Sequence, residues 1–137
     1  MLIDVDDFKK INDTYGHLYG DVVLKTVAQL LAGQLRSADL IARFGGDEFV
    51  VILPETTQER ARVVAERIEQ ATSTHPAGNV PLAVSIGVAT FRPGLTPEHL
   101  LEESDQDLYR QKGSSRRNVA RQEGAGGQVQ NTISFEI

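Results

Sequence analysis

The sequence predicts an α+β domain in which helices flank a central, mostly antiparallel sheet. Two observations lead to this prediction. Short apolar runs typical of strands alternate with longer segments whose apolar residues recur at helical spacing. Two of the short runs also flank a Gly-Gly pair, which indicates an antiparallel β-hairpin. The chain has 137 residues, a length that suits one domain with one core.

The first half of the chain predicts a strand, a helix and a hairpin. The strand covers residues 1–5, and because chain termini commonly fray, we expect further chain upstream. The helix covers residues 20–35, where one apolar stripe consists of Val23, Val27, Leu30 and Leu31. The hairpin covers about 40–53, with Gly45 and Gly46 at its tip, because glycine accepts the positive φ of tight turns.

The second half predicts a helix, a strand and a longer helix. Thr56-Thr57-Gln58-Glu59 matches a capping box that opens the first of these helices. Residues 83–89 read as a buried strand, in which Gly87 allows another backbone to approach closely. Thr96-Pro97 opens a helix to about Lys112.

The C-terminal region predicts less regular structure. A last short strand is expected near 118–119, and the glycine-rich residues 124–128 are typical of a flexible linker. Apolar residues alternate again, as in a strand, at Ile133, Phe135 and Ile137. We therefore divide the chain into a domain over residues 1–123 and a linker with a tail over 124–137.

Composition limits the classes of function. The formal net charge of −5 argues against a general nucleic-acid surface. No apolar run approaches the roughly 20 residues that cross a bilayer, so we expect no membrane segment in this chain. The absence of cysteine excludes disulfides and thiolate chemistry and is compatible with the cytoplasm, where we expect the protein.

Acidic residues gather at two points of the predicted sheet. Asp47 and Glu48 stand at the hairpin tip, although ordinary turns also use Gly-Asp sequences. Asp4, Asp6 and Asp7 stand at the end of the first strand, where an ordinary solvated strand end is the alternative. If that strand pairs beside the hairpin, one of these aspartates and Asp47 would converge on a divalent cation such as Mg²⁺.

A polar, glycine-rich segment precedes the first long helix. It admits two interpretations, an ordinary cap and turn or a site that recognises a base. An aspartate acceptor together with an asparagine amide would satisfy the donors and the acceptor of a guanine edge. The segment's polar and glycine residues are Asn12, Asp13, Gly16, His17, Gly20 and Asp21.

Several ordered motifs together resemble the GGDEF diguanylate cyclase family over about residues 1–119. The central motif is Gly45-Gly46-Asp47-Glu48-Phe49, preceded by Arg43-Phe44. The other matching segments are residues 4–17, Gly20-Asp21, residues 84–89, and Asp105 with Tyr109 and Lys112.

The resemblance implies a fold akin to nucleotidyl cyclase and polymerase palm domains, and the condensation of two GTP into cyclic di-GMP by a homodimer. Mg²⁺, or Mn²⁺ in its place, would be held by Asp4, the Val5 carbonyl and Asp47. Glu48 would be a further metal ligand or the base that assists the 3′-hydroxyl. Residues implied in substrate binding are Asp7, Phe8, Lys9, Asn12, Asp21, Gly45, Gly46, Lys112 and Arg116.

The resemblance also implies a site for feedback inhibition. Arg36-Ser37-Ala38-Asp39 lies at the family's inhibitory-site spacing, so Arg36 and Asp39 would bind cyclic di-GMP, with Arg67 as a second-site arginine. Without the family, Arg36 and Asp39 are a charged helix end.

The chain departs from the family pattern at both ends. It begins inside the first strand, without the family's leading helix, and Asp107 stands where the family usually has alanine. Near the C-terminus, Arg116 and Arg117 compete for one phosphate-binding role. We therefore keep two further hypotheses beside the enzyme: a catalytically weak module that senses cyclic di-GMP or GTP, and a structural dimerisation domain.

Overall fold

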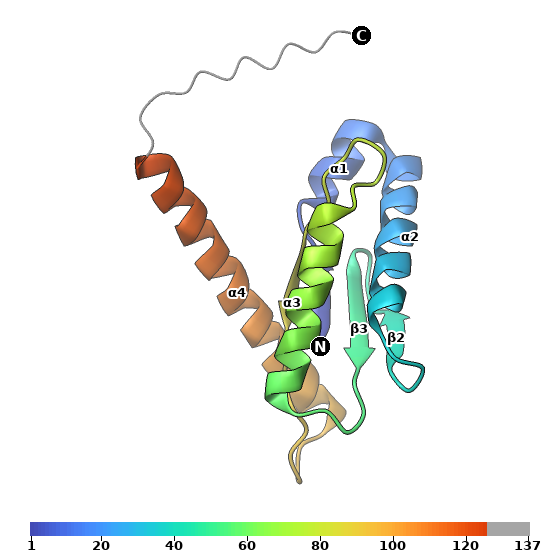
Figure 1. The fold of residues 1–137 in the computed structure, drawn as a ribbon, viewed down its shortest axis with the longest axis vertical. Helices are drawn as coiled ribbons and strands as arrows, with labels where there is room; N and C mark the ends of the chain where they lie inside the picture. The colour runs from blue at the N-terminus through green and yellow to red at the C-terminus, as the bar shows by residue number, and fades with distance from the viewer. Residues whose placement is uncertain (126–137) are drawn as a thin grey trace, which may run out of the picture.

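The computed structural model describes the backbone of residues 1–125 and the side chains of residues 1–114. Strands and helices follow one another in the order βααββαβα (Figure 1). The elements are β1 (Leu2–Val5), α1 (Phe8–Tyr15), α2 (His17–Gln34), β2 (Leu40–Arg43), β3 (Glu48–Ile52), α3 (Gln58–Thr74), β4 (Val84–Gly87) and α4 (Pro97–Ala125).

The four strands form one sheet in the order β2-β3-β1-β4, and every neighbouring pair is antiparallel. The predicted α+β class and the antiparallel hairpin are therefore confirmed. In the register of the sheet, Asp4 on β1 lies opposite Glu48 on one side and Ser85 on the other. The sheet thus places the first acidic strand end directly beside the hairpin, as the sequence suggested.

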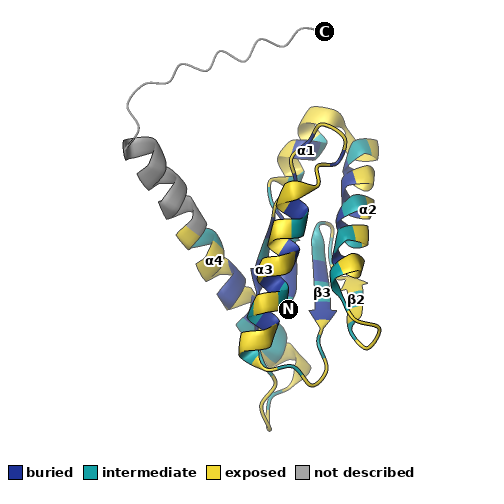
Figure 2. Cartoon of the chain, in the orientation of Figure 1, coloured by how far each residue is buried: buried dark blue, intermediate teal, exposed yellow. Residues whose placement is uncertain are grey.

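One face of the sheet carries the main hydrophobic core. Alternate residues of the strands, including Ile3, Phe49 and Ile86, belong to one buried cluster with apolar residues of α2 and α3. In Figure 1, α2 and α3 run alongside each other, and in Figure 2 their inner sides are buried. Figure 2 also shows the edge strand β2 as mostly exposed.

The opposite face receives α4. A Cβ built on Gly87 would lie 1.9 Å from the Ser104 carbonyl oxygen and 2.6 Å from the Leu108 backbone nitrogen. No side chain fits in that space, so glycine is what lets the backbone of α4 approach β4, as predicted. Because Leu2 and Asp4 lie on the same face as Gly87, the contact sets α4 beside the acidic end of β1.

The structure corrects several details of the predicted elements. Residues 8–15 form the separate helix α1, which the sequence did not predict, and α2 begins at His17 rather than at 20. The cap of α3 is Thr57, whose hydroxyl accepts from the Arg60 N–H, so the capping position is one residue later than Thr56. Thr56 instead donates to the Pro54 carbonyl.

The C-terminal helix is longer than predicted. Residues 118–119 belong to α4 and not to a strand, and α4 also includes residues 124–125 of the predicted linker. The rest of that linker and the alternating segment 133–137 lie outside the described residues.

Candidate metal and nucleotide site

Two carboxylates meet across β1 and β3. Asp4 and Glu48 are directly opposite each other in the antiparallel register, and both line a cavity of about 530 Å³ beside α4. Burial, together with the charges of Asp4 and Asp47, raises the pKa of Glu48. Asp47 is tied to β1 by its carbonyl, which accepts from the Val5 N–H at 3.0 Å. The hairpin tip and the strand end therefore form one acidic region.

Gly45 provides space for the Glu48 carboxylate. A Cβ at position 45 would lie 2.7 Å from Glu48 Oε2, whereas a Cβ at Gly46 would meet nothing within 4 Å. Neither glycine has a positive φ, so the turn conformation expected from the sequence is wrong. The requirement for glycine at position 45 comes from the neighbouring side chain and not from a left-handed backbone.

Lys112 brings a positive charge to the acidic end of the cavity, which Arg110 also lines. Its Nζ lies 3.2 Å from Asp4 Oδ2, and the Asp4 side chain is only 19% exposed. Burial raises the pKa of Asp4, while the Lys112 ammonium acts in the opposite direction. Residues 108 positions apart in the sequence are thus joined where the family resemblance places metal and phosphate binding.

The sequence did not assign two further residues to this cavity. Asp105 and Tyr109 lie on α4 and line the cavity with Glu48 and Lys112. The charge of Asp105 contributes to the raised pKa of Glu48. The spacing of 105, 109 and 112 follows one side of a helix and would have predicted their common location.

The first turn of α1 faces the end of β1. Asp7 caps this helix in a left-handed conformation, with φ of 55°, and its side chain makes no capping hydrogen bond. The first amides of a helix have no partners within the helix, and they attract anions. Lys9 is exposed in the same turn, next to the partly buried Phe8. This end of α1 can therefore receive phosphate oxygens.

The two predicted base-binding residues come from neighbouring helices. Asn12 on α1 packs against Gly20 on α2, the residue that precedes Asp21. Asp21 is exposed, and Asn12 Oδ1 is buried with no hydrogen-bond partner among the described residues. The side chains of Arg116 and Arg117 lie outside the described residues, so their competition stays undecided.

The predicted inhibitory residues lie together at the other end of α2. The Arg36 guanidinium binds the Asp39 carboxylate at 3.1 Å and the Thr56 hydroxyl at 3.0 Å. Arg67 on α3 donates to the Gln34 carbonyl. Although desolvation raises the pKa of Asp39, hydrogen bonds from Arg36 and the charges of Arg36 and Arg67 hold it below its usual value. The three residues form one charged cluster.

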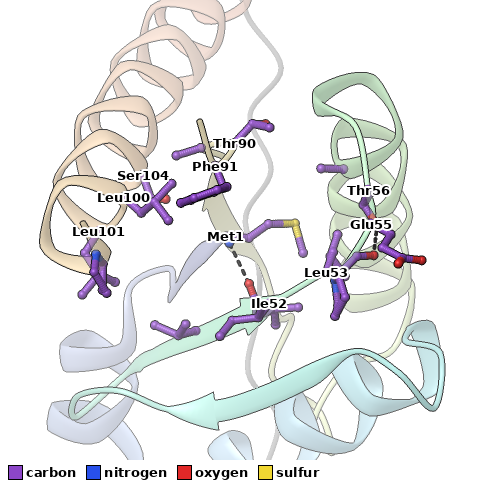
Figure 3. A pocket seen from close by; sticks show the side chains of 16 residues that line it. Met1, Ile52, Leu53, Glu55, Thr56, Thr90, Phe91, Leu100, Leu101 and Ser104 are labelled. Atoms are coloured by element: carbon purple, nitrogen blue, oxygen red, sulfur yellow. Dashed lines mark hydrogen bonds between the residues drawn. The ribbon is translucent and has the colours of Figure 1, made fainter. Parts of the chain in front are cut away.

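A second cavity, of about 560 Å³, lies between β3, the loop before α3 and the start of α4 (Figure 3). Apolar side chains such as Met1, Ile52, Phe91 and Leu100 line it. None of the predicted site residues lines this second cavity. We therefore assign the chemistry to the acidic cavity.

The acidic region fits a divalent cation by the chemistry of its donors. No group of three or more acidic or histidine side chains is close enough to form a complete metal site within the described residues. Mg²⁺ does not require one, because it usually binds one or two carboxylates and keeps water and substrate phosphates as its other ligands. Asp4 and Glu48 supply such a pair of hard oxygen ligands.

Comparisons with known proteins agree with this geometry. Residues 1–118 match the family described as "Diguanylate cyclase, GGDEF domain". The chain is 46% identical over 126 residues to the response regulator PleD of Caulobacter vibrioides, covering 87% of this chain and 28% of PleD. It is 45% identical over 119 residues to the diguanylate cyclase DgcP of Pseudomonas aeruginosa, covering 84% of this chain and 18% of DgcP. The chain therefore spans under a third of these curated relatives.

Solved structures give the same result. The diguanylate cyclase SiaD of Pseudomonas aeruginosa, solved with its activator SiaC, matches 82% of this chain and 45% of its own, with a TM-score of 0.78 and 37% identity. The GGDEF domain of DgcB from Caulobacter crescentus, solved in complex with c-di-GMP, matches 82% of this chain and 70% of its own, with a TM-score of 0.77 and 31% identity. No helix among the described residues is long and apolar enough to cross a membrane. By sequence and by fold, this chain belongs to the GGDEF domain family of diguanylate cyclases.

Proposed function

We propose that this domain condenses two molecules of GTP into cyclic di-GMP. The observation that carries the proposal is the cross-strand pair of Asp4 and Glu48, which shares one cavity with Lys112. Carboxylates that hold a divalent cation beside a lysine that binds phosphate are suited to phosphoryl transfer. Named diguanylate cyclases among the relatives support the same reaction.

In this proposal the acidic residues and Lys112 have separate tasks. Asp4, the Val5 carbonyl, Asp47 and Glu48 hold Mg²⁺, or Mn²⁺ in its place. The cation, when bound, neutralises charge that develops on the phosphates. The Lys112 ammonium breaks its ion pair with Asp4 and binds the triphosphate instead.

The remaining substrate contacts come from the end of α1 and the start of α2. Lys9 and the amides near Asp7 and Phe8 bind the phosphates. Asn12 and Asp21 bind the guanine edge, which offers two donors and one acceptor.

The reaction requires two GTP-loaded domains. The 3′-oxygen of each GTP attacks the α-phosphorus of the other, which forms two phosphodiester bonds and releases two pyrophosphates. Each 3′-hydroxyl loses its proton, and Glu48, whose pKa is raised, is the candidate base. One domain holds one GTP, so we propose a homodimer as the active form. GTP is an intracellular nucleotide, and we accordingly place the reaction in the cytoplasm.

We also propose that cyclic di-GMP inhibits the reaction by binding at Arg36, Asp39 and Arg67. The clustering of these three residues away from the acidic cavity supports this site. The complex of the related DgcB domain with c-di-GMP supports the same ligand. The same cluster favours a second candidate function, a weakly catalytic module that senses cyclic di-GMP.

The product formed from GTP and Mg²⁺ distinguishes the two functions. The enzyme forms cyclic di-GMP and pyrophosphate, at a rate per domain that rises with protein concentration because two domains must meet. A weakly catalytic sensor binds cyclic di-GMP but forms little or no product, even at high protein concentration.

A further inference from the structure

Gly20 on α2 and Asn12 on α1 are in close contact. A Cβ built on Gly20 would lie 1.9 Å from Asn12 Oδ1 and 2.9 Å from Asn12 Cγ. The Phe8 ring is the third neighbour, at 3.2 Å. The Asn12 amide therefore occupies the space that any side chain at position 20 would need.

The amide that fills this space is not satisfied by the protein. Asn12 Oδ1 is buried without a hydrogen-bond partner among the described residues. A buried polar atom without a partner costs free energy, and in native proteins such an atom usually has a specific reason. The absence of a side chain at position 20 leaves room for this orientation of the amide, which no hydrogen bond within the described residues holds.

We infer that Gly20 is a positioning residue for guanine recognition, because its lack of a side chain lets the Asn12 amide pack against α2 at the residue that precedes Asp21. This inference rests on the proposed function, in which Asn12 and Asp21 bind the guanine edge. The backbone of Gly20 does not have a positive φ, so an alanine there is compatible with α2. Its methyl group would collide with the end of a flexible side chain, and the Asn12 amide would rotate away.

The test compares Gly20→Ala with Gly33→Ala, another glycine of the same helix. A Cβ at Gly33 meets nothing within 4 Å, so this variant reports only the effect of alanine on helix stability. Affinities for GTP and for ATP are measured by calorimetry in Mg²⁺, with thermal unfolding as a check of the fold. Since ATP shares the phosphates and lacks the guanine edge, the ratio of the two affinities isolates base recognition.

We expect Gly20→Ala to weaken GTP binding about tenfold, the loss of one or two hydrogen bonds, with ATP binding unchanged. Gly33→Ala retains the preference for GTP. Repeating Gly20→Ala in an Asn12→Ala background should have no further effect, because the proposed contact is then already absent.

Two results would overturn the inference while leaving the proposed function intact. One is an unchanged preference for GTP in Gly20→Ala. The other is an equal loss of GTP affinity in the Asn12→Ala background, which would show that Gly20 does not act through Asn12. A wild-type chain with no preference for GTP over ATP would overturn both the inference and the proposed guanine site.

Discussion

Lys112 on α4 and Asp4 on β1 form an ion pair of 3.2 Å inside the acidic cavity. The ammonium group thus lies where a divalent cation and its phosphates would have to bind. Mg²⁺ alone must compete with Lys112 for Asp4, whereas Mg²⁺ together with GTP gives Lys112 a new anionic partner. We therefore expect the pair to couple metal binding to nucleotide binding.

Lys112→Gln should separate these two binding events. We expect GTP to bind about tenfold more weakly in Mg²⁺, since a charge-assisted contact to phosphate is lost. Mg²⁺ without nucleotide should bind more tightly, because the competing ammonium is gone. Calorimetric titrations of both ligands measure the effects, with Lys25→Gln on the exposed side of α2 as the control. Weaker Mg²⁺ binding in Lys112→Gln would argue against the competition.

Glu48→Gln should abolish the synthesis of cyclic di-GMP. We expect a loss of at least about 100-fold, the usual contribution of a positioned acid or base, and a loss of metal affinity as well. Asp47→Asn should act in the same direction. Product formation is measured by chromatography, with Glu102→Gln on the exposed side of α4 as the control. An active Glu48→Gln variant would exclude Glu48 as an essential ligand or base.

Glu48→Gln should also stabilise the metal-free fold at neutral pH. Burial and neighbouring carboxylates raise the pKa of Glu48 above its ordinary value of 4.5. The folded state therefore binds this proton more tightly than the unfolded state, and its stability increases as the pH falls through the raised pKa. Thermal unfolding should show Glu48→Gln to be more stable than wild type at pH 7. The difference in stability between the two proteins should shrink as the pH is lowered toward the ordinary pKa of glutamate. A less stable variant at pH 7 would contradict this.

Arg36→Ala should weaken the binding of cyclic di-GMP and spare that of GTP. Loss of a guanidinium removes charge-assisted hydrogen bonds, so we expect about a tenfold higher dissociation constant. Stability should change by about 1 kcal/mol, because the Arg36 side chain is 62% exposed and the Asp39 carboxylate keeps its hydrogen bond from the Arg36 backbone N–H. Titrations of both nucleotides into this variant and into Arg60→Ala, an exposed arginine at the start of α3, measure the effect. Unchanged affinity would reduce Arg36 and Asp39 to a charged helix end.

Asp107 should be essential for stability. Its carboxylate, with the side chain only 7% exposed, accepts from the Val88 N–H and from Arg62, both at 2.7 Å. It thus joins α4, α3 and the residue after β4. We expect Asp107→Ala to lower the free energy of unfolding by about 3 kcal/mol, because the buried Val88 N–H and the partly buried Arg62 guanidinium both lose their acceptor. Asp107→Asn, which keeps an acceptor, should lose less of the free energy of unfolding, as measured by urea titration. An Asp107→Ala variant as stable as wild type would contradict the stabilising role of Asp107.

Local patterns predicted much of this fold. Alternation and the Gly-Gly pair located the hairpin, and the small residue at position 87 predicted the close approach of α4. Helix α1 was missed because it has only eight residues, so its short apolar stripe of Phe8, Ile11 and Tyr15 stands among polar and charged residues typical of a turn.

The candidate site was predictable only in part. The sequence supplied Asp47 and Glu48 as a motif, but the pairing of Asp4 with Lys112 depends on how α4 crosses the sheet. Glycine at position 45 was attributed to its backbone, whereas the structure attributes it to the Glu48 carboxylate. The Asp4–Lys112 pair arises from tertiary packing, and the contact at Gly45 from the side-chain orientation of Glu48, and neither follows from the order of residues in the motif.

A calorimetric titration of GTP into the chain, in Mg²⁺ and again in a chelator, tests whether the acidic cavity binds nucleotide through a metal ion. If the cavity of Asp4, Glu48 and Lys112 is a metal-dependent nucleotide site, GTP binds at one molecule per chain in Mg²⁺. Binding should then be lost, or at least about tenfold weaker, when the cation is removed. GTP binding of equal strength with and without Mg²⁺, or no binding in either, would contradict the account.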